Sequence, residues 1–262
     1  MSDIELYVFV IVFTVAVVAG CVDAIAGGGG LLTVPALLLV GFDPVTAIAT
    51  NKLQGSAGAL SATFAFARKG LIDWRIGLPM ALVAAFAAVL GAFSVNALPR
   101  PFVSAVLPFI LIMIALYFVF APKMGHEDAR ARISSGVFML AVVPFIGFYD
   151  GIFGPGAGSF YMVAFVGLLG YGVVKATAHT KLTNAAGNLG GLCFFASTGA
   201  INWKVGFIMA IGAFVGAQFG SKLAMSMGIK LIRPLLVVIC LLMTIRLLLD
   251  TSNPIRLFIS RI

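Results

Sequence analysis

A few charged side chains lie within long apolar stretches of the chain, and they are the residues best able to do chemistry. They are Asp23, Lys52, Asp150 and Lys181, with His179 two positions before the last of them. A charged group inside an apolar segment costs several kcal/mol, so such residues mark functional sites by default. The two lysines predict a site for an anion. The two aspartates predict charge pairing or proton coupling, and His179 predicts either a proton relay or a hydrogen bond to the ligand.

Amide and glycine residues beside these charges complete the candidate site. The predicted substrate-binding residues are Lys52, Lys181, Asn51, Gln54, His179, Asn184, Gly28, Gly29 and Gly156. Amides supply hydrogen bonds, and glycines let the backbone leave a helix so that its N–H groups can face an anion. The alternative is that Asp23–Lys52 and Asp150–Lys181 are buried pairs that only neutralise each other. We predict no catalytic residue, metal ligand or cofactor, because the chain has only two histidines.

The composition defines the class of protein that must position these residues. Hydrophobic residues make up 61% of the chain and charged residues 10%, with a mean hydropathy of +1.14. Soluble domains carry roughly a quarter charged residues, so a soluble fold is excluded. Apolar stretches of about 20 residues recur, as membrane-spanning helices require. The basic residues cluster in short loops, as the positive-inside rule predicts, so we expect a lipid bilayer and no nucleic acid as partner.

An internal repeat divides the chain into two related halves. When Gly41–Arg75 is aligned with Gly170–Lys204, fourteen of the 35 positions are identical, including Lys52 with Lys181. A related alignment places Asp23 on Asp150. We therefore predict an all-α polytopic membrane protein with a first repeat over 1–120, a cytoplasmic linker over 121–133 and a second repeat over 134–262.

Each half shows the same series of segments. A span is followed by a glycine-rich break, a short apolar segment, a long helix and two further spans. The predicted ranges are 4–22, 27–30, 31–41, 44–67, 76–95 and 102–120 in the first half, and 134–149, 154–158, 159–170, 173–198, 205–221 and 232–249 in the second.

The short apolar segments leave the topology open. If they re-enter the membrane and return, the chain has about eight membrane segments and parallel halves. If they cross, it has up to ten segments and inverted halves. The distribution of Lys and Arg over the loops favours inverted halves.

Paired motifs in both halves resemble those of a known family. They are Asp23-Ala-Ile-Ala-Gly-Gly-Gly-Gly30 and Ala49-Thr-Asn-Lys-Leu53 in the first half, and Gly147-Phe-Tyr-Asp-Gly-Ile-Phe-Gly-Pro155 and Ala176-Thr-Ala-His-Thr-Lys-Leu182 in the second. The sequence resembles the TauE/SafE family of sulfite and sulfonate exporters, and most closely its YfcA-like bacterial branch. The resemblance implies a multi-pass transporter of the bacterial inner membrane, linked to sulfite and organosulfur anions.

The functional expectation is a secondary transporter for small anions, with a central site between the repeats. Repeat-containing transporters bind substrate near the bilayer midplane, where broken helices direct their N-termini at anionic groups. A passive anion channel is one alternative. Ser159 and His179 leave an intramembrane hydrolase as an alternative of another class. Substrate identity, direction of transport and coupling ion stay open, as does assembly into a homo-oligomer.

Overall fold

The computed structural model describes residues 6–96 and 127–227, with a few positions between 98 and 113. The described elements are helices, and no strand occurs among them. The span predicted over 232–249 lies outside the described residues. So do most of the span predicted over 102–120 and the first half of the linker.

The first half contains four described helices. They are α1 (Leu6–Ala26), α2 (Gly30–Leu39), α3 (Pro44–Ala67) and α4 (Trp74–Asn96). The start of α3 follows from its sequence, because the Asp43 carboxylate accepts a hydrogen bond from the Thr46 N–H at 3.3 Å and Pro44 occupies the first turn. The predicted long helix over 44–67 is confirmed, and the glycine-rich break separates α1 from α2 as expected.

The second half repeats this order. Its elements are α6 (Ser135–Val137), the π-helical segment η1 (Phe138–Val142), α7 (Val143–Ile152), α8 (Ala157–Leu169), α9 (Val173–Thr198) and α10 (Trp203–Met227). The first three are continuous with one another and together make one candidate span of 18 residues, Ser135–Ile152. The predicted helix over 173–198 is confirmed as α9.

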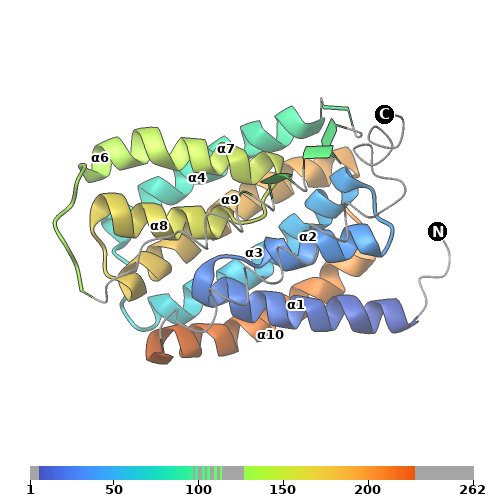
Figure 1. Ribbon diagram of the computed structural model, residues 1–262, viewed down its shortest axis with the longest axis horizontal. Coiled ribbons are helices and arrows are strands. Elements are labelled where there is room, and N and C mark those ends of the chain that lie inside the picture. The colour runs from blue at the N-terminus through green and yellow to red at the C-terminus, as the bar shows by residue number, and fades with distance from the viewer. Residues whose placement is uncertain are drawn as a thin grey trace.

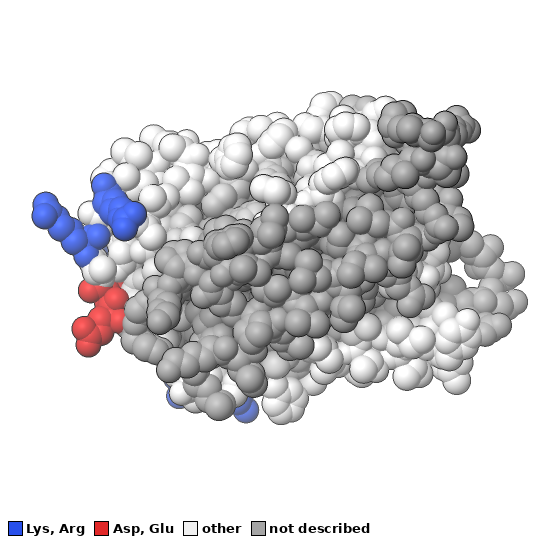
Figure 2. All heavy atoms as spheres, in the orientation of Figure 1, with Lys and Arg blue, Asp and Glu red and all other residues white. Residues whose placement is uncertain are grey.

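Four of the described helices are long and apolar enough to cross a membrane by length and composition. They are Leu6–Ala26, Trp74–Val95, Ser135–Ile152 and Trp203–Ser226. Large apolar side chains such as Phe86 on α4 and Phe219 on α10 are exposed on the outside. In Figure 2 the charged atoms visible on described residues gather toward the end that carries the 127–134 loop. An apolar surface without charges beyond that end is what the hydrocarbon core of a bilayer requires.

The polar side chains lie on the two most central helices, α3 and α9, which pack against each other (Figure 1). Both are longer than α1 but less apolar, and each is packed against helices of the other half. The surrounding helices therefore shield their polar faces from lipid.

Each short helix folds back along the helix before it. The Tyr161 hydroxyl of α8 donates a hydrogen bond to the Val143 carbonyl of α7. The Phe165 ring of α8 packs at a tilt on Phe138 of η1, with 4.8 Å between the ring centroids. In the first half, Val34 of α2 likewise packs in one cluster with Val12 of α1. Figure 1 shows α2 beside α1 and α8 beside α7. The short helices α2 and α8 therefore pack against the helices that precede them.

The two halves interlock through their outer helices. α1 of the first half packs on α10 of the second, and α7 of the second packs on α4 of the first. Glycines allow the backbones to approach closely: a Cβ added at Gly216 would lie 1.9 Å from the Val17 carbonyl oxygen, and one at Gly151 would lie 2.2 Å from that of Ala88. Neither half could keep these contacts alone.

The end of the linker is fastened to the start of α9. The Asp128 carboxylate accepts hydrogen bonds from the Gly172 N–H and the Lys175 ammonium, both at 2.7 Å. These two donors hold the pKa of Asp128 below its ordinary value, because they stabilise the ionised carboxylate. The contact lies outside the membrane-spanning helices and is exposed to solvent.

Candidate functional site

The buried charges form two ion pairs, and both pairs connect the two halves. Lys52 Nζ of α3 lies 2.7 Å from Asp150 Oδ1 of α7, and Lys181 Nζ of α9 lies 3.1 Å from Asp23 Oδ2 of α1. The alternative in which Asp23 pairs with Lys52 and Asp150 with Lys181 is therefore wrong. The reason is the interlocked packing, which places each lysine beside the broken helix of the opposite half.

Each lysine also binds the end of that broken helix. Lys52 Nζ donates to the Asp150 carbonyl oxygen near the end of α7, and Lys181 Nζ donates to the Asp23 carbonyl oxygen near the end of α1. The last four carbonyl groups of a helix lack intrahelical partners and carry its negative dipole end. Each ammonium group therefore contacts a backbone carbonyl and a carboxylate oxygen together, which stabilises the positive charge inside the protein.

The backbone changes direction at equivalent glycines four residues after each aspartate. Gly27 has φ +79° and Gly154 has φ +87°, a left-handed conformation that side chains with a Cβ rarely adopt. The two breaks touch, since a Cβ added at Gly27 would lie 2.3 Å from the carbonyl carbon of Gly158. The two helix breaks, each four residues after an aspartate, therefore lie against each other.

A cavity lies between the halves at these breaks. Its polar lining consists of the Asp23 carboxylate and the side chains of Asn51, Gln54, Asn184 and Asn188. Glycines of both breaks complete the wall, and the cavity contains about 370 Å³ of unfilled space, including the part that is open to the outside. Asn51, Gln54 and Asn184 thus line the same cavity as Asp23.

Two of the amides are held in defined orientations. The Thr33 hydroxyl donates to Asn51 Oδ1 at 2.5 Å, which leaves the Asn51 amino group to donate elsewhere. Asn188 Nδ2 donates to the Asn184 carbonyl at 2.9 Å, so the Asn188 carbonyl oxygen remains an acceptor. Thr33 was absent from the predicted site, because a single threonine in an apolar segment shows no pattern in the sequence.

The predicted glycines differ in their placement. Gly29 lines the cavity, and its N–H donates to Asp23 Oδ1 at 3.1 Å. Gly28 is buried within the same break, and Gly156 adopts φ +81° just before α8, but neither is part of the cavity lining. Both lysines also lie behind the cavity wall, where their side chains are fully buried.

His179 does not reach the cavity. Its Nε2 accepts a hydrogen bond from the Asp73 N–H at 3.2 Å, its Nδ1 contacts the Lys175 carbonyl oxygen at 2.9 Å, and its ring packs on Tyr171. The helical spacing explains the difference, because position 179 faces the turn between α3 and α4 while position 181 faces the broken helix. The residue holds that turn in place.

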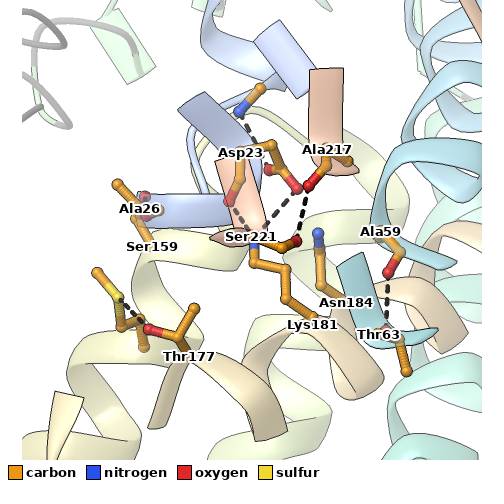
Figure 3. Close-up of polar contacts among 12 residues, drawn as sticks. Asp23, Ala26, Ala59, Thr63, Ser159, Thr177, Lys181, Asn184, Ala217 and Ser221 are labelled. Carbon is orange, nitrogen blue, oxygen red and sulfur yellow. Dashed lines mark hydrogen bonds and ion pairs between the residues drawn. The ribbon is translucent and has the colours of Figure 1, made fainter. Parts of the chain in front are cut away.

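Ser159 is also committed to a structural contact. Its hydroxyl donates to the Ala26 carbonyl at the end of α1 at 2.7 Å, as Figure 3 shows. Since His179 faces Asp73, these two residues have different partners and do not form the nucleophile and base that a serine hydrolase needs.

The glycines of the long helices serve two purposes. Gly190 lets α9 approach the backbone of α4, as close packing predicts, with an added Cβ only 2.3 Å from the Ala85 carbonyl oxygen. By contrast, an added Cβ at Gly187 would meet Asp150 Oδ2 at 2.6 Å, and one at Gly191 would meet the Lys52 stem at 3.1 Å. Glycine is therefore required at these two positions because it leaves room for the ion pair.

The fold and the site thus define a helical membrane protein with a polar centre where two broken helices meet. The chain belongs to the sulfite exporter TauE/SafE family, whose model matches residues 12–247. It is 49% identical over 260 residues to a protein of Sinorhizobium sp named probable membrane transporter protein ORF9, a match that covers 99% of this chain and 100% of the relative.

More distant relatives carry similar names. The probable membrane transporter protein YfcA of Escherichia coli (strain K12) is 45% identical over 93% of this chain and 90% of its own length. The probable membrane transporter protein YunE of Bacillus subtilis (strain 168) is 24% identical over 92% of this chain and 97% of its own. No solved structure matches the chain. The family and these names indicate a membrane transporter rather than an enzyme.

Proposed function

We propose that the protein is a secondary transporter that moves small anions across the bacterial inner membrane, which it crosses several times. The observation that carries the proposal is the pair of crossed ion pairs, Lys52–Asp150 and Lys181–Asp23, at two helix breaks that meet beside a cavity. Broken helices at the interface of two repeats are the usual site of substrate binding in secondary transporters.

The halves are related as an inverted repeat in this proposal. In Figure 1, α1 begins at the end near the N-terminus, whereas α6 begins at the opposite end, and α3 and α9 likewise run in opposite directions. The contacts are reciprocal, because each half supplies one lysine to the aspartate of the other. A twofold axis in the membrane plane accounts for both features. Under this symmetry, one half faces one side of the membrane in the way that the other half faces the opposite side.

Small anions are the substrate class that the site favours. The N-termini of α2 and α8 follow directly after the breaks, and the first N–H groups of a helix attract negative charge. Two lysines stand behind the cavity, and the Asn51 amino group is free to donate. The name of the family points to sulfur oxyanions among such substrates.

Alternating access would work through the interlocked contacts. Each ion pair joins α3 or α9 of one half to the broken helix of the other, so relative movement of the halves changes both pairs. An anion that replaces a carboxylate beside a lysine would weaken one of these links. A ligand can shift a conformational equilibrium only by such a difference in binding between the two states.

Counterflow in proteoliposomes tests the proposal and separates a carrier from a channel. Vesicles containing the purified protein are loaded with sulfite, sulfoacetate or acetate, and uptake of the same labelled anion is measured. A carrier gives transient accumulation driven by exchange, whereas a channel lets the label only equilibrate. We expect Lys181→Ala to abolish counterflow and Lys175→Ala, at an exposed lysine, to leave it unchanged. If no small anion accumulates in exchange with the wild-type protein, the proposal is wrong.

A further inference from the structure

The Asp23 carboxylate is bound in the way that a substrate oxyanion would be bound. One oxygen accepts the Gly29 N–H at the N-terminus of α2, and the other pairs with the Lys181 ammonium. A helix N-terminus and a lysine ammonium are two groups that commonly bind oxyanions in proteins. Figure 3 shows the carboxylate directed at Lys181, and Asp23 also lines the central cavity. The carboxylate therefore occupies a preformed anion site beside that cavity.

The equivalent carboxylate of the second half is placed differently. The Asp150 side chain is only 2% exposed, whereas that of Asp23 is 14% exposed, and Asp150 is not part of the cavity lining. Gly187 lies against Asp150 Oδ2, so that side is closed by the backbone of α9. The two aspartates are related by the repeat, yet only Asp23 is accessible to a ligand or a proton from the cavity.

The cavity also holds an acceptor that lacks a partner. The Oε1 atom of Gln54 is buried and has no hydrogen-bond partner among the described residues, and Gln54 lines the same cavity as Asp23. A buried acceptor without a partner is unfavourable, so this oxygen favours a state in which a donor is present. A protonated carboxyl group is such a donor, whereas a carboxylate is not.

We propose that Asp23 couples anion transport to protons by competing with the substrate for one site. In the ionised form its carboxylate occupies the position between the α2 N-terminus and Lys181. Protonation removes the negative charge, weakens both contacts and frees the position for an oxyanion. This inference rests on the proposed transport function and adds the coupling ion and the residue that carries it.

The charges balance with one proton for each anion. Protonation of Asp23 and binding of a monoanion leave the net charge of the site unchanged, because one negative charge replaces another beside Lys181. When the anion leaves on the other side of the membrane, the carboxyl group loses its proton there and pairs with Lys181 again. The proton and the anion therefore move together, and transport of a monoanion is electroneutral.

Other titratable groups near Asp23 are few in the described part of the chain. Lys181 of α9 is in contact with it, and the Lys52–Asp150 pair is near enough to interact electrostatically. On α1 itself and on α8 the other titratable groups are Cys21 and Tyr161, whose hydroxyl donates to a carbonyl. On α9, Lys175 pairs with Asp128 and His179 accepts the Asp73 N–H. On α10, Lys204 lies over the Phe9 ring and Lys222 is exposed. Asp23 is the one carboxylate in this group that lines the cavity.

The test uses methanesulfonate and sulfoacetate in proteoliposomes that contain a trapped pH-sensitive dye. Both sulfonates keep a constant charge between about pH 6 and 8, so a pH effect in that range comes from the protein. For the wild type we expect proton uptake together with the anion, at one proton per anion. Its apparent affinity for the sulfonate should fall as the pH rises from about 6 to 8, because one proton is taken up with the ligand.

Variants separate coupling from folding. Asp23→Asn is expected to exchange sulfonate without proton movement and with no dependence on pH, while Asp23→Glu keeps both. Asp128→Asn, which removes an exposed carboxylate, serves as the matched control and should behave as the wild type.

Three results would overturn the inference. They are wild-type sulfonate uptake without proton movement, an Asp23→Asn protein with unchanged proton coupling, and a monodisperse Asp23→Asn protein that cannot exchange anions. If Asp23→Asn does not fold, the proton count of the wild type decides alone. In all of these cases wild-type counterflow still supports the proposed transport function, whereas a wild type that exchanges no anion would remove both proposals.

Discussion

Breaking the Lys52–Asp150 pair should destabilise the protein strongly. Both side chains are almost fully buried, at 0% and 2% exposure, and the Lys52 ammonium also holds the Asp150 carbonyl. Lys52→Met keeps the length of the side chain but leaves the carboxylate without its partner. Removing one member of a buried pair costs about 3–5 kcal/mol, because the remaining charge is neither solvated nor neutralised. For a chain of this size that corresponds to a fall in Tm of roughly 6–20 °C.

The double variant Lys52→Met/Asp150→Asn distinguishes charge from packing. It removes both charges, so most of the loss should be recovered, and the coupling energy between the two sites should exceed about 2 kcal/mol. Tm and denaturant midpoints of the purified protein in detergent provide the measurement. Lys175→Met is the matched control, since the Lys175–Asp128 pair is exposed and such pairs contribute about 0–1 kcal/mol. A Lys52→Met protein as stable as the control, or a double variant no better than the single one, would refute this reasoning.

Three further predictions concern the folding and stability of the protein in detergent. Gly187→Ala should lower Tm by several degrees because its Cβ would meet the Asp150 carboxylate at 2.6 Å, while Gly167→Ala, with open space around it, should leave Tm unchanged or raise it slightly. Gly27→Ala should impair folding, measured as the yield of monodisperse protein, because its φ is +79° and its Cβ would lie 2.3 Å from the other break; a normal yield would contradict the role given to that break. Because the pKa of Asp128 is lowered in the folded protein, its ionised carboxylate stabilises the fold above about pH 4. This stabilisation is lost as the pH falls through the folded-state pKa. Asp128→Asn should therefore flatten the change in Tm over that acidic range. An unchanged acid profile would show that this contact does not contribute.

The helices could be predicted because their signals are local. Asp43 and Pro44 define the start of α3, and the glycines after Asp23 and Asp150 define the breaks that end α1 and α7. Length and composition were enough to indicate a membrane protein, since apolar helices of about 20 residues match the thickness of a bilayer. The repeat showed that Lys52 and Lys181 have equivalent positions.

The placement of His179 could not be predicted in this way. It is two residues from Lys181, and in a helix that separation points the two side chains in different directions. The sequence alone does not show which of the two faces the centre, because this depends on how α9 is rotated against its neighbours. Thr33 was missed for a related reason: its contact with Asn51 joins residues that are brought together only by the return of α2 along α1.

The sequence by itself determined the membrane class, the two halves, the helix breaks and the four buried charges, because each depends on composition or on residues close together in the chain. Only the tertiary structure decided that the charges pair across the halves, Lys52 with Asp150 and Lys181 with Asp23. The physical reason is that α1 packs on α10 and α7 on α4, which carries each broken helix into the opposite half. The same packing exposes Asp23 to the cavity and encloses Asp150, a difference between equivalent residues that the repeat alone could not show.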